Sequence, residues 1–180
     1  MKTYDQIRIY HPIDFGHKRI TRSAPINAVW TPGHIMVTVG GVLTLSNAYT
    51  TLTHLTSPIL ILESDISTRN DGKTFSTDFG SDGITALEIK SPTLFTPHGV
   101  RALLNVAALF TGAAPQEGFV VIRSLTAPGK YEALSRANYN ALVTQTFGAL
   151  VIAAADLAHL RVGYIDGSVN ADGFVPVAYT

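Results

Sequence analysis

The fold class of this chain is decided by the stretch His34-Ile35-Met36-Val37-Thr38-Val39-Gly40-Gly41-Val42-Leu43-Thr44-Leu45-Ser46. Two runs rich in β-branched and aliphatic residues flank a Gly-Gly pair. Glycine adopts the positive φ of a tight hairpin turn at little steric cost. Thr31-Pro32-Gly33 adds a turn signal just before the first run. The sequence therefore predicts a β-hairpin over residues 31–46.

Further strands are predicted outside this hairpin. Pro58–Glu63 is an apolar run that starts after proline and stops at an acidic residue, which is typical of a buried strand. The other segments with strand character are 73–79, 84–90, 119–123, 147–154 and 161–165. We therefore expect a mainly β fold, with residues 31–180 as a single core domain.

One or two short helices interrupt this pattern. Over Pro97–Thr111, Thr96 can cap, proline suits the first helical turn, and apolar residues recur at helical spacing. These observations predict a helix from about Pro97 to Thr111. Residues 132–145 are ambiguous, with a short helix favoured, and residues 167–180 are predicted to be a glycine-bearing tail.

Residues 1–30 differ from the rest because they mix apolar and basic side chains without a sustained period. We interpret them as an extended N-terminal arm. The alternative is a short edge strand over Gln6–Tyr10 followed by a surface loop. His17-Lys18-Arg19, with Arg22 close behind, could dock on an acidic protein surface or on nucleic acid, or could be a solvated loop. The candidate partner-binding residues of the arm are Ile7, Ile9, Tyr10, Phe15, Lys18, Arg19 and Arg22.

The composition narrows the possible partners. The 180 residues include 13 Lys plus Arg against 13 Asp plus Glu, and 46% are hydrophobic but only 14% charged. A neutral chain does not have the basic surplus of a general nucleic-acid binder. Free monomers usually carry about a quarter charged residues, so the low charge favours a β-rich assembly subunit. We expect a soluble protein with no membrane partner and no secretory signal.

Motifs for catalysis or cofactor binding are not found. The chain has no cysteine, and its six histidines are scattered. The acidic loop 65–82 does not have EF-hand spacing, and its Asp-Gly pairs are typical of turns. Neither a Gly-x-Ser-x-Gly elbow nor a phosphate-cradling glycine loop occurs. We therefore expect no catalytic residues, no metal and no cofactor, and the sequence does not indicate an enzyme.

From Ala28 onward the chain resembles the capsid decoration proteins of tailed bacteriophages, also called cement or head-stabilising proteins. Ala28–Met36 is similar to the opening strand of their core, and Pro58–Asp65 to a strand that ends in an acidic residue. Phe75–Gly83 resembles their aromatic-x-x-Gly-Asp turn. Phe147–Ala153 followed by Arg161–Ile165 resembles their closing hairpin. Family cores usually have another strand where this chain has the helix-like segment 97–111.

The resemblance implies a compact β-barrel core called a β-tulip. It also implies homotrimers on the outer surface of the virion capsid, where N-terminal arms clamp neighbouring major capsid protein subunits. Three alternatives stay open. The first is a phage tail or baseplate subunit with a similar core. The second is a small hydrolase or lyase that uses His34, His54 or His98, and the third is a glycan-binding module that uses Trp30 and tyrosines.

Overall fold

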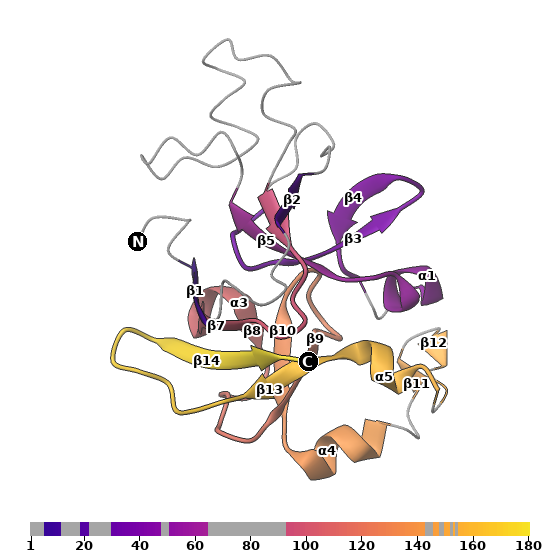
Figure 1. The fold of residues 1–180 in the computed structure, drawn as a ribbon. Coiled ribbons are helices and arrows are strands. Elements are labelled where there is room, and N and C mark those ends of the chain that lie inside the picture. The colour runs from indigo at the N-terminus through magenta and orange to yellow at the C-terminus, as the bar shows by residue number, and fades with distance from the viewer. Residues whose placement is uncertain are drawn as a thin grey trace.

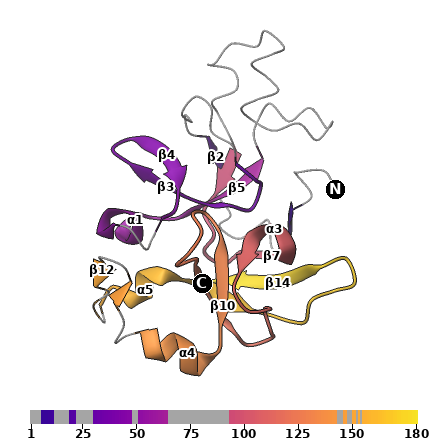
Figure 2. The same ribbon diagram turned by 180° about the vertical axis from the view of Figure 1, so that it is seen from behind.

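The structure is a computed structural model, and it describes residues 6–11, 19–21, 30–47, 51–64, 93–142, 146–147, 150–151, 153 and 155–180. The described chain is mainly β, with short helices at its periphery (Figures 1 and 2). This confirms the fold class expected from the sequence. The predicted strands 73–79 and 84–90 lie outside the described residues.

The larger sheet has seven strands in the order β1-β7-β14-β13-β9-β10-β8. The sheet is curled, as Figure 1 shows by the different directions of its strands β10 and β14. All of its neighbouring strands are antiparallel except β10 and β8, which are parallel. Its strands are β1 (Ile7–His11), β7 (Arg101–Asn105), β8 (Phe110–Thr111), β9 (Val120–Arg123), β10 (Tyr131–Leu134), β13 (Arg161–Ile165) and β14 (Phe174–Tyr179).

The smaller sheet has five antiparallel strands in the order β2-β6-β5-β3-β4. Its strands are β2 (Arg19–Thr21), β3 (Ile35–Val39), β4 (Val42–Leu45), β5 (Leu60–Ser64) and β6 (Thr93–Phe95). The predicted strand over Pro58–Glu63 is confirmed as β5. A separate two-stranded sheet pairs β11 (Thr146–Phe147) with β12 (Leu150–Val151), so the strand predicted over 147–154 is divided.

The predicted hairpin is confirmed as β3 and β4. Val39 pairs with Val42 across a two-residue turn, in which Gly40 and Gly41 have φ of 57° and 82°. Positive φ at both central residues defines the turn whose twist matches that of the flanking strands. The local sequence is therefore sufficient to specify this part of the fold.

Four short helices lie in the described part of the chain. They are α1 (Leu52–Thr56), α3 (Val106–Leu109), α4 (Arg136–Ala141) and α5 (Leu157–Leu160). Helix α1 lies between the hairpin and the larger sheet, because its Leu55 is fully buried in a cluster with Val120 and Ile122 of β9. Residues 132–142 divide between the end of β10 and α4, so the predicted short helix is confirmed only in part, and residues 143–145 lie outside the described residues.

The predicted helix over Pro97–Thr111 is wrong. Strand β7 occupies its centre, and only Val106–Leu109 are helical, with the Asn105 side chain accepting a hydrogen bond from the Ala108 N–H. Ala102 and Leu104 are fully buried while Leu103 is partly exposed, which is the alternation of a strand. Pairing with β1 and β14 overrides the helical spacing of the apolar residues.

The predicted tail over residues 167–180 is also wrong. Strand β14 lies between β7 and β13, near the middle of the larger sheet. Pro176 is unusual there because proline cannot donate to a ladder. Its carbonyl accepts from the Asp166 N–H, just beyond the last residue of β13. The side of Pro176 that has no N–H to donate therefore faces the end of β13. The pairing of β14 with β7 is kept.

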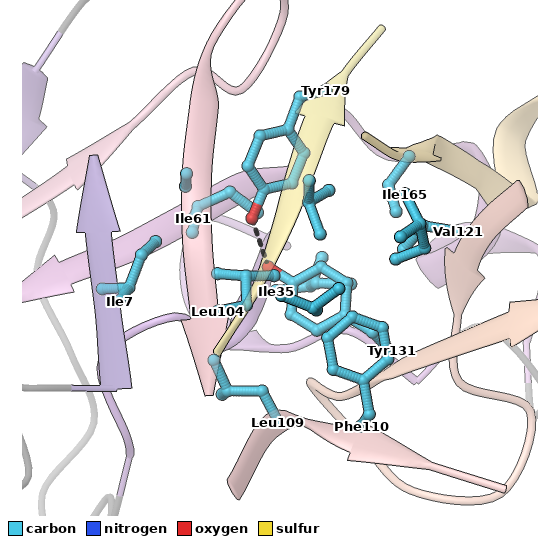
Figure 3. Packing of buried hydrophobic residues seen from close by; sticks show 14 of the residues in the cluster. Ile7, Ile35, Ile61, Leu104, Leu109, Phe110, Val121, Tyr131, Ile165 and Tyr179 are labelled. Carbon is cyan, nitrogen blue, oxygen red and sulfur yellow. Dashed lines mark hydrogen bonds between the residues drawn. The ribbon is translucent and has the colours of Figure 1, made fainter. Parts of the chain in front are cut away.

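The core lies between the two sheets. Its main cluster joins Ile35 and Ile61 of the smaller sheet to Leu104 and Val121 of the larger one (Figure 3). The fully buried Tyr131 hydroxyl donates to the Gly33 carbonyl at 2.7 Å and lies 2.9 Å from the Tyr179 hydroxyl. Burial raises the pKa of both phenols, so they stay protonated. These hydrogen bonds connect the two sheets through their common interior.

Candidate interaction surface

The N-terminal residues in the structure contact the larger sheet of their own chain. Strand β1 pairs antiparallel with β7, and Ile7 is only 7% exposed within the main core cluster. The alternative of an edge strand over Gln6–Tyr10 therefore agrees with the structure. The Ile7 side chain packs against the chain's own core, so a contact of Ile7 with a partner stays a prediction that requires this strand to leave the sheet.

For the other candidate arm residues, the structure gives at most the strand and its pairing. Ile9 pairs with Ala102, and Tyr10 lies at a shift of register between Ile9 and His11. Arg19 is the first residue of β2, opposite Phe95. The remaining candidates, Phe15, Lys18 and Arg22, lie outside the described residues. Partner binding by these six residues therefore stays a prediction.

Two charged side chains of the larger sheet hold nearby loops. The Glu132 Oε1 accepts hydrogen bonds from the Ser124 Oγ at 2.8 Å and the Leu125 N–H at 2.7 Å. Arg123 is 4% exposed and donates to the carbonyls of His54 and Ser57 at the end of α1, where a positive charge is favoured. Burial lowers the pKa of Arg123 to about 10. These groups stabilise local structure.

Two of the histidines considered for catalysis accept hydrogen bonds from the backbone. The His34 Nδ1 accepts from the Thr31 N–H, and the His54 Nδ1 from the Asn47 N–H, both at 3.1 Å. Burial, together with the charge of Lys130, lowers the pKa of His34 to about 4. A neutral, buried imidazole of this kind supports the loop before β3. His98 is exposed and has no such role in the described residues.

The described residues offer neither an exposed tryptophan ring for a sugar nor a group of side chains arranged to hold a metal ion. Trp30 is 9% exposed and packs with Met36 and Leu43, so its ring is not presented to a sugar. Within the described ranges, no group of three His, Asp or Glu side chains is arranged to hold a metal ion. An open concavity of about 340 Å³ is lined by Tyr139, Ala158, Arg161 and Thr180, and there the Arg161 guanidinium donates to the Thr180 hydroxyl.

The best candidate surface is the free edge of the hairpin. Residues 23–62 contain no Asp, Glu, Lys or Arg, and β3, β4 and α1 all belong to this stretch. Val42 on β4 is 52% exposed and Leu52 on α1 is 49% exposed, and they are the two most exposed large hydrophobic residues of the described chain. The charge-free stretch is visible in the sequence, and it is the signal that could have located this surface.

Strand β4 is an edge strand among the described residues. Within them, β3 is its one neighbour, and β4 ends the smaller sheet opposite the β2 edge (Figure 1). Because Val39 and Val42 flank a two-residue turn, Val42 and Thr44 direct their backbone groups toward β3. The Ser46 N–H, which donates to the Ile35 carbonyl, continues this alternation. The N–H and C=O groups of Leu43 and Leu45 therefore point away from β3, although Leu43 as a whole residue is only 1% exposed.

The remaining sheet edges in the described part of the chain are protected in ordinary ways. The sequences of β1 and β2 include Arg8 and Arg19, and β8, β11 and β12 have only two residues each. Charges and short length are the usual means of preventing edge-to-edge association. β4 has neither a charge nor a proline. It is therefore the edge best suited to pairing with another chain.

Comparison with protein-family models, with curated proteins and with solved structures finds no match to this chain. Among the described residues, no helix has the length and apolar character needed to cross a membrane. The class that the fold and surface define is a mainly β protein whose β4 edge, in the described part of the chain, carries no charge.

Proposed function

We propose that this chain is a structural virion protein that decorates a phage capsid and stabilises it by bridging neighbouring major capsid protein subunits. The observation that carries an assembly role is the uncharged β4 edge with its exposed Val42. Such an edge favours association with protein, since unpaired backbone groups and apolar side chains gain from being covered. The sequence resemblance supplies the identity of the partner.

In this proposal the protein acts by contact and transforms no molecule. Subunits on the outer capsid surface, as homotrimers, would hold several contacts at once, and multivalency would strengthen each of them. Lys18, Arg19 and Arg22 would contact an acidic patch of the capsid protein. Because Ile7 packs in the chain's own core, the clamp would depend on the rest of the N-terminal segment. Neither nucleic acid nor a membrane is required as a partner.

The copy number of the protein in purified particles tests this function. Quantitative mass spectrometry should find this chain in numbers comparable to the major capsid protein, because decoration sites repeat over the whole shell. Gold-labelled antibody against the chain should mark the head evenly. A few copies confined to the tail would contradict the proposal and support a tail or baseplate subunit. Absence from the particle would contradict both.

A further inference from the structure

We propose that the turn Thr31–His34 is an acid-sensitive latch between the two sheets. When His34 takes up a proton, the turn opens and Trp30 leaves its apolar cluster, while both sheets stay folded. This inference concerns the chain by itself and does not depend on a capsid. Its basis is the position of the turn, the bonding of the His34 ring and the charges near that ring.

The turn is bonded to both sheets through Gly33. The Gly33 N–H donates to the Leu62 carbonyl of β5, in the smaller sheet, at 2.6 Å. The Gly33 carbonyl accepts from the Tyr131 hydroxyl of β10, in the larger sheet, at 2.7 Å. Both bonds require the bent backbone of the turn, in which Gly33 has a φ of 97°. Opening of the turn would therefore break a link between β5 and β10.

The His34 side chain closes this turn from within. Its Nδ1 accepts from the Thr31 N–H at 3.1 Å, and the His34 N–H donates to the Thr31 carbonyl at 3.0 Å. The residue is 8% exposed and lies against Gly129, because a Cβ atom at that glycine would be 3.4 Å from the His34 Cγ. A protonated imidazole carries hydrogen on both nitrogens, so Nδ1 could no longer accept. Protonation therefore removes one bond of the turn and also encloses a charge.

The groups around the ring also disfavour a positive charge. Burial, together with the charge of Lys130, lowers the pKa of His34 to about 4. Strands β3 and β4 contain no titratable side chain, and the Tyr131 phenol of β10 stays protonated. The carboxylates on the neighbouring strands are Glu63 of β5 and Glu132 of β10, and Glu132 is bonded to the loop after β9. Lys130 is therefore the charge whose removal should alter the latch.

Acid favours the open turn because the two conformations bind the proton differently. The pKa of His34 is about 4 in the closed turn, whereas an imidazole in water has a pKa of 6.5. The open turn therefore binds the proton more tightly, and opening becomes easier as the pH falls from 6.5 toward 4. Relative to neutral pH, the ratio of open to closed turns should rise about 25-fold at pH 5 and about 100-fold at pH 4.

Opening of the turn would move Trp30 and leave the sheets paired. Trp30 directly precedes Thr31, is 9% exposed and packs with Met36 and Leu43. Strand β3 has its own ladders with β4 and β5, and β10 has its own ladder with β9. The change is therefore local, and the single tryptophan of the chain reports it.

Tryptophan fluorescence between pH 7 and pH 4 tests the latch. Acrylamide quenching of Trp30 should increase as the pH falls, while the far-UV circular dichroism stays unchanged. His34→Asn keeps a carbonyl oxygen near the position of Nδ1 but cannot take up a proton, so it should abolish the increase. His98→Asn is the matched control, because His98 is exposed, and it should behave as the natural chain does.

Lys130→Gln tests the latch without changing the ring. Removal of that charge weakens the bias against a protonated His34, so the quenching transition should move to lower pH. Arg136→Gln is the matched control, since Arg136 is exposed on α4, and it should leave the transition in place. Glu63→Gln should also leave it in place.

Four results would overturn the latch. The first is quenching that stays unchanged down to pH 4, and the second is an equal increase in His34→Asn. The third is loss of the circular dichroism signal at the same pH, which would mean that the whole protein unfolds. The fourth is a transition that Lys130→Gln does not move. None of these results bears on the presence of the protein on a capsid, so the two proposals fail separately.

Discussion

The polar groups in the interior around Tyr131 are paired with one another, whereas some of those on the hairpin edge at β4 point away from the sheet. In the interior, the two phenols and the Gly33 carbonyl satisfy one another although they are fully enclosed. At the hairpin edge, the outward backbone groups of Leu43 and Leu45 have no neighbouring strand in the described structure. The difference teaches that the polar groups around Tyr131 are satisfied within one chain, whereas β4 ends its sheet, among the described residues, with neither a charge nor a proline on the strand.

The largest effect expected in the core comes from Gly163 on β13. A Cβ atom there would lie against the Ala178 carbonyl of β14, where no flexible side chain can move aside. Gly163→Ala should lower the free energy of unfolding by roughly 3 kcal/mol or more. Chemical denaturation measures this loss. Gly112→Ala is the control, because that glycine has open space and only its positive φ of 81° opposes a side chain, so its cost should be about 1 kcal/mol.

Acid should weaken the connection between the hairpin and the larger sheet through His34. Its pKa is about 4 in the folded protein and 6.5 in an unfolded chain, so the unfolded chain binds the proton more readily between these values. Stability is therefore complete above pH 6.5 and falls as the pH decreases toward 4, approaching a loss of roughly 3 kcal/mol. Urea denaturation across this range measures the slope.

The matched comparison uses two histidine variants. His34→Gln should flatten the slope, whereas His98→Gln should leave it unchanged because His98 is exposed. Equal slopes in the natural chain and in His34→Gln would show that other groups cause the acid sensitivity.

The N-terminal strand should contribute to the core in the isolated protein. Ile7→Ala removes a side chain that is 7% exposed in the main cluster, and comparable deletions cost about 2 to 5 kcal/mol. Because β1 is an edge strand whose surroundings can relax, we expect the lower end of that range. Thermal and urea unfolding measure it. An unchanged stability would mean that this strand does not rest on the core, and the free-arm interpretation would be restored.

The two buried tyrosines should differ in importance. Tyr131→Phe leaves both the Gly33 carbonyl and the Tyr179 hydroxyl unpaired, so it should cost about 2 kcal/mol. Tyr179→Phe keeps the bond from Tyr131 to Gly33 and should cost about 1 kcal/mol. The double variant should cost little more than Tyr131→Phe alone, since the hydroxyls form one network. Additive losses would contradict this arrangement.

Sequence-based prediction succeeded where a structure depends on local interactions and failed where it depends on contacts between distant segments. The hairpin around Gly40 and Gly41 was predictable because its turn and pairing are local. The strand at Arg101–Asn105 was not, because its apolar residues fit a helix equally well until β1 and β14 pair beside it. β14 was missed because Pro176 and the nearby glycines are typical of a loop, and only the end of β13 makes a proline acceptable there.

The candidate surface was only partly predictable. The low overall charge indicated an assembly subunit, but attention fell on the N-terminal apolar residues, of which Ile7 is buried. The charge-free stretch 23–62 was available in the sequence. Its meaning depends on the sheet order, because only that order shows β4 to be an edge strand, and sheet order is set by contacts between distant segments.

Amide hydrogen exchange read by mass spectrometry, on the free protein and on the protein bound to phage capsids, tests the central claim most directly. Peptides that contain β4 (Val42–Leu45) should exchange more slowly on the capsid than in the free protein, because the account places this edge against the capsid protein. Peptides that contain β13 (Arg161–Ile165), inside the larger sheet, should exchange equally in both samples. Unchanged exchange over β4 on the capsid would contradict the role given to this edge.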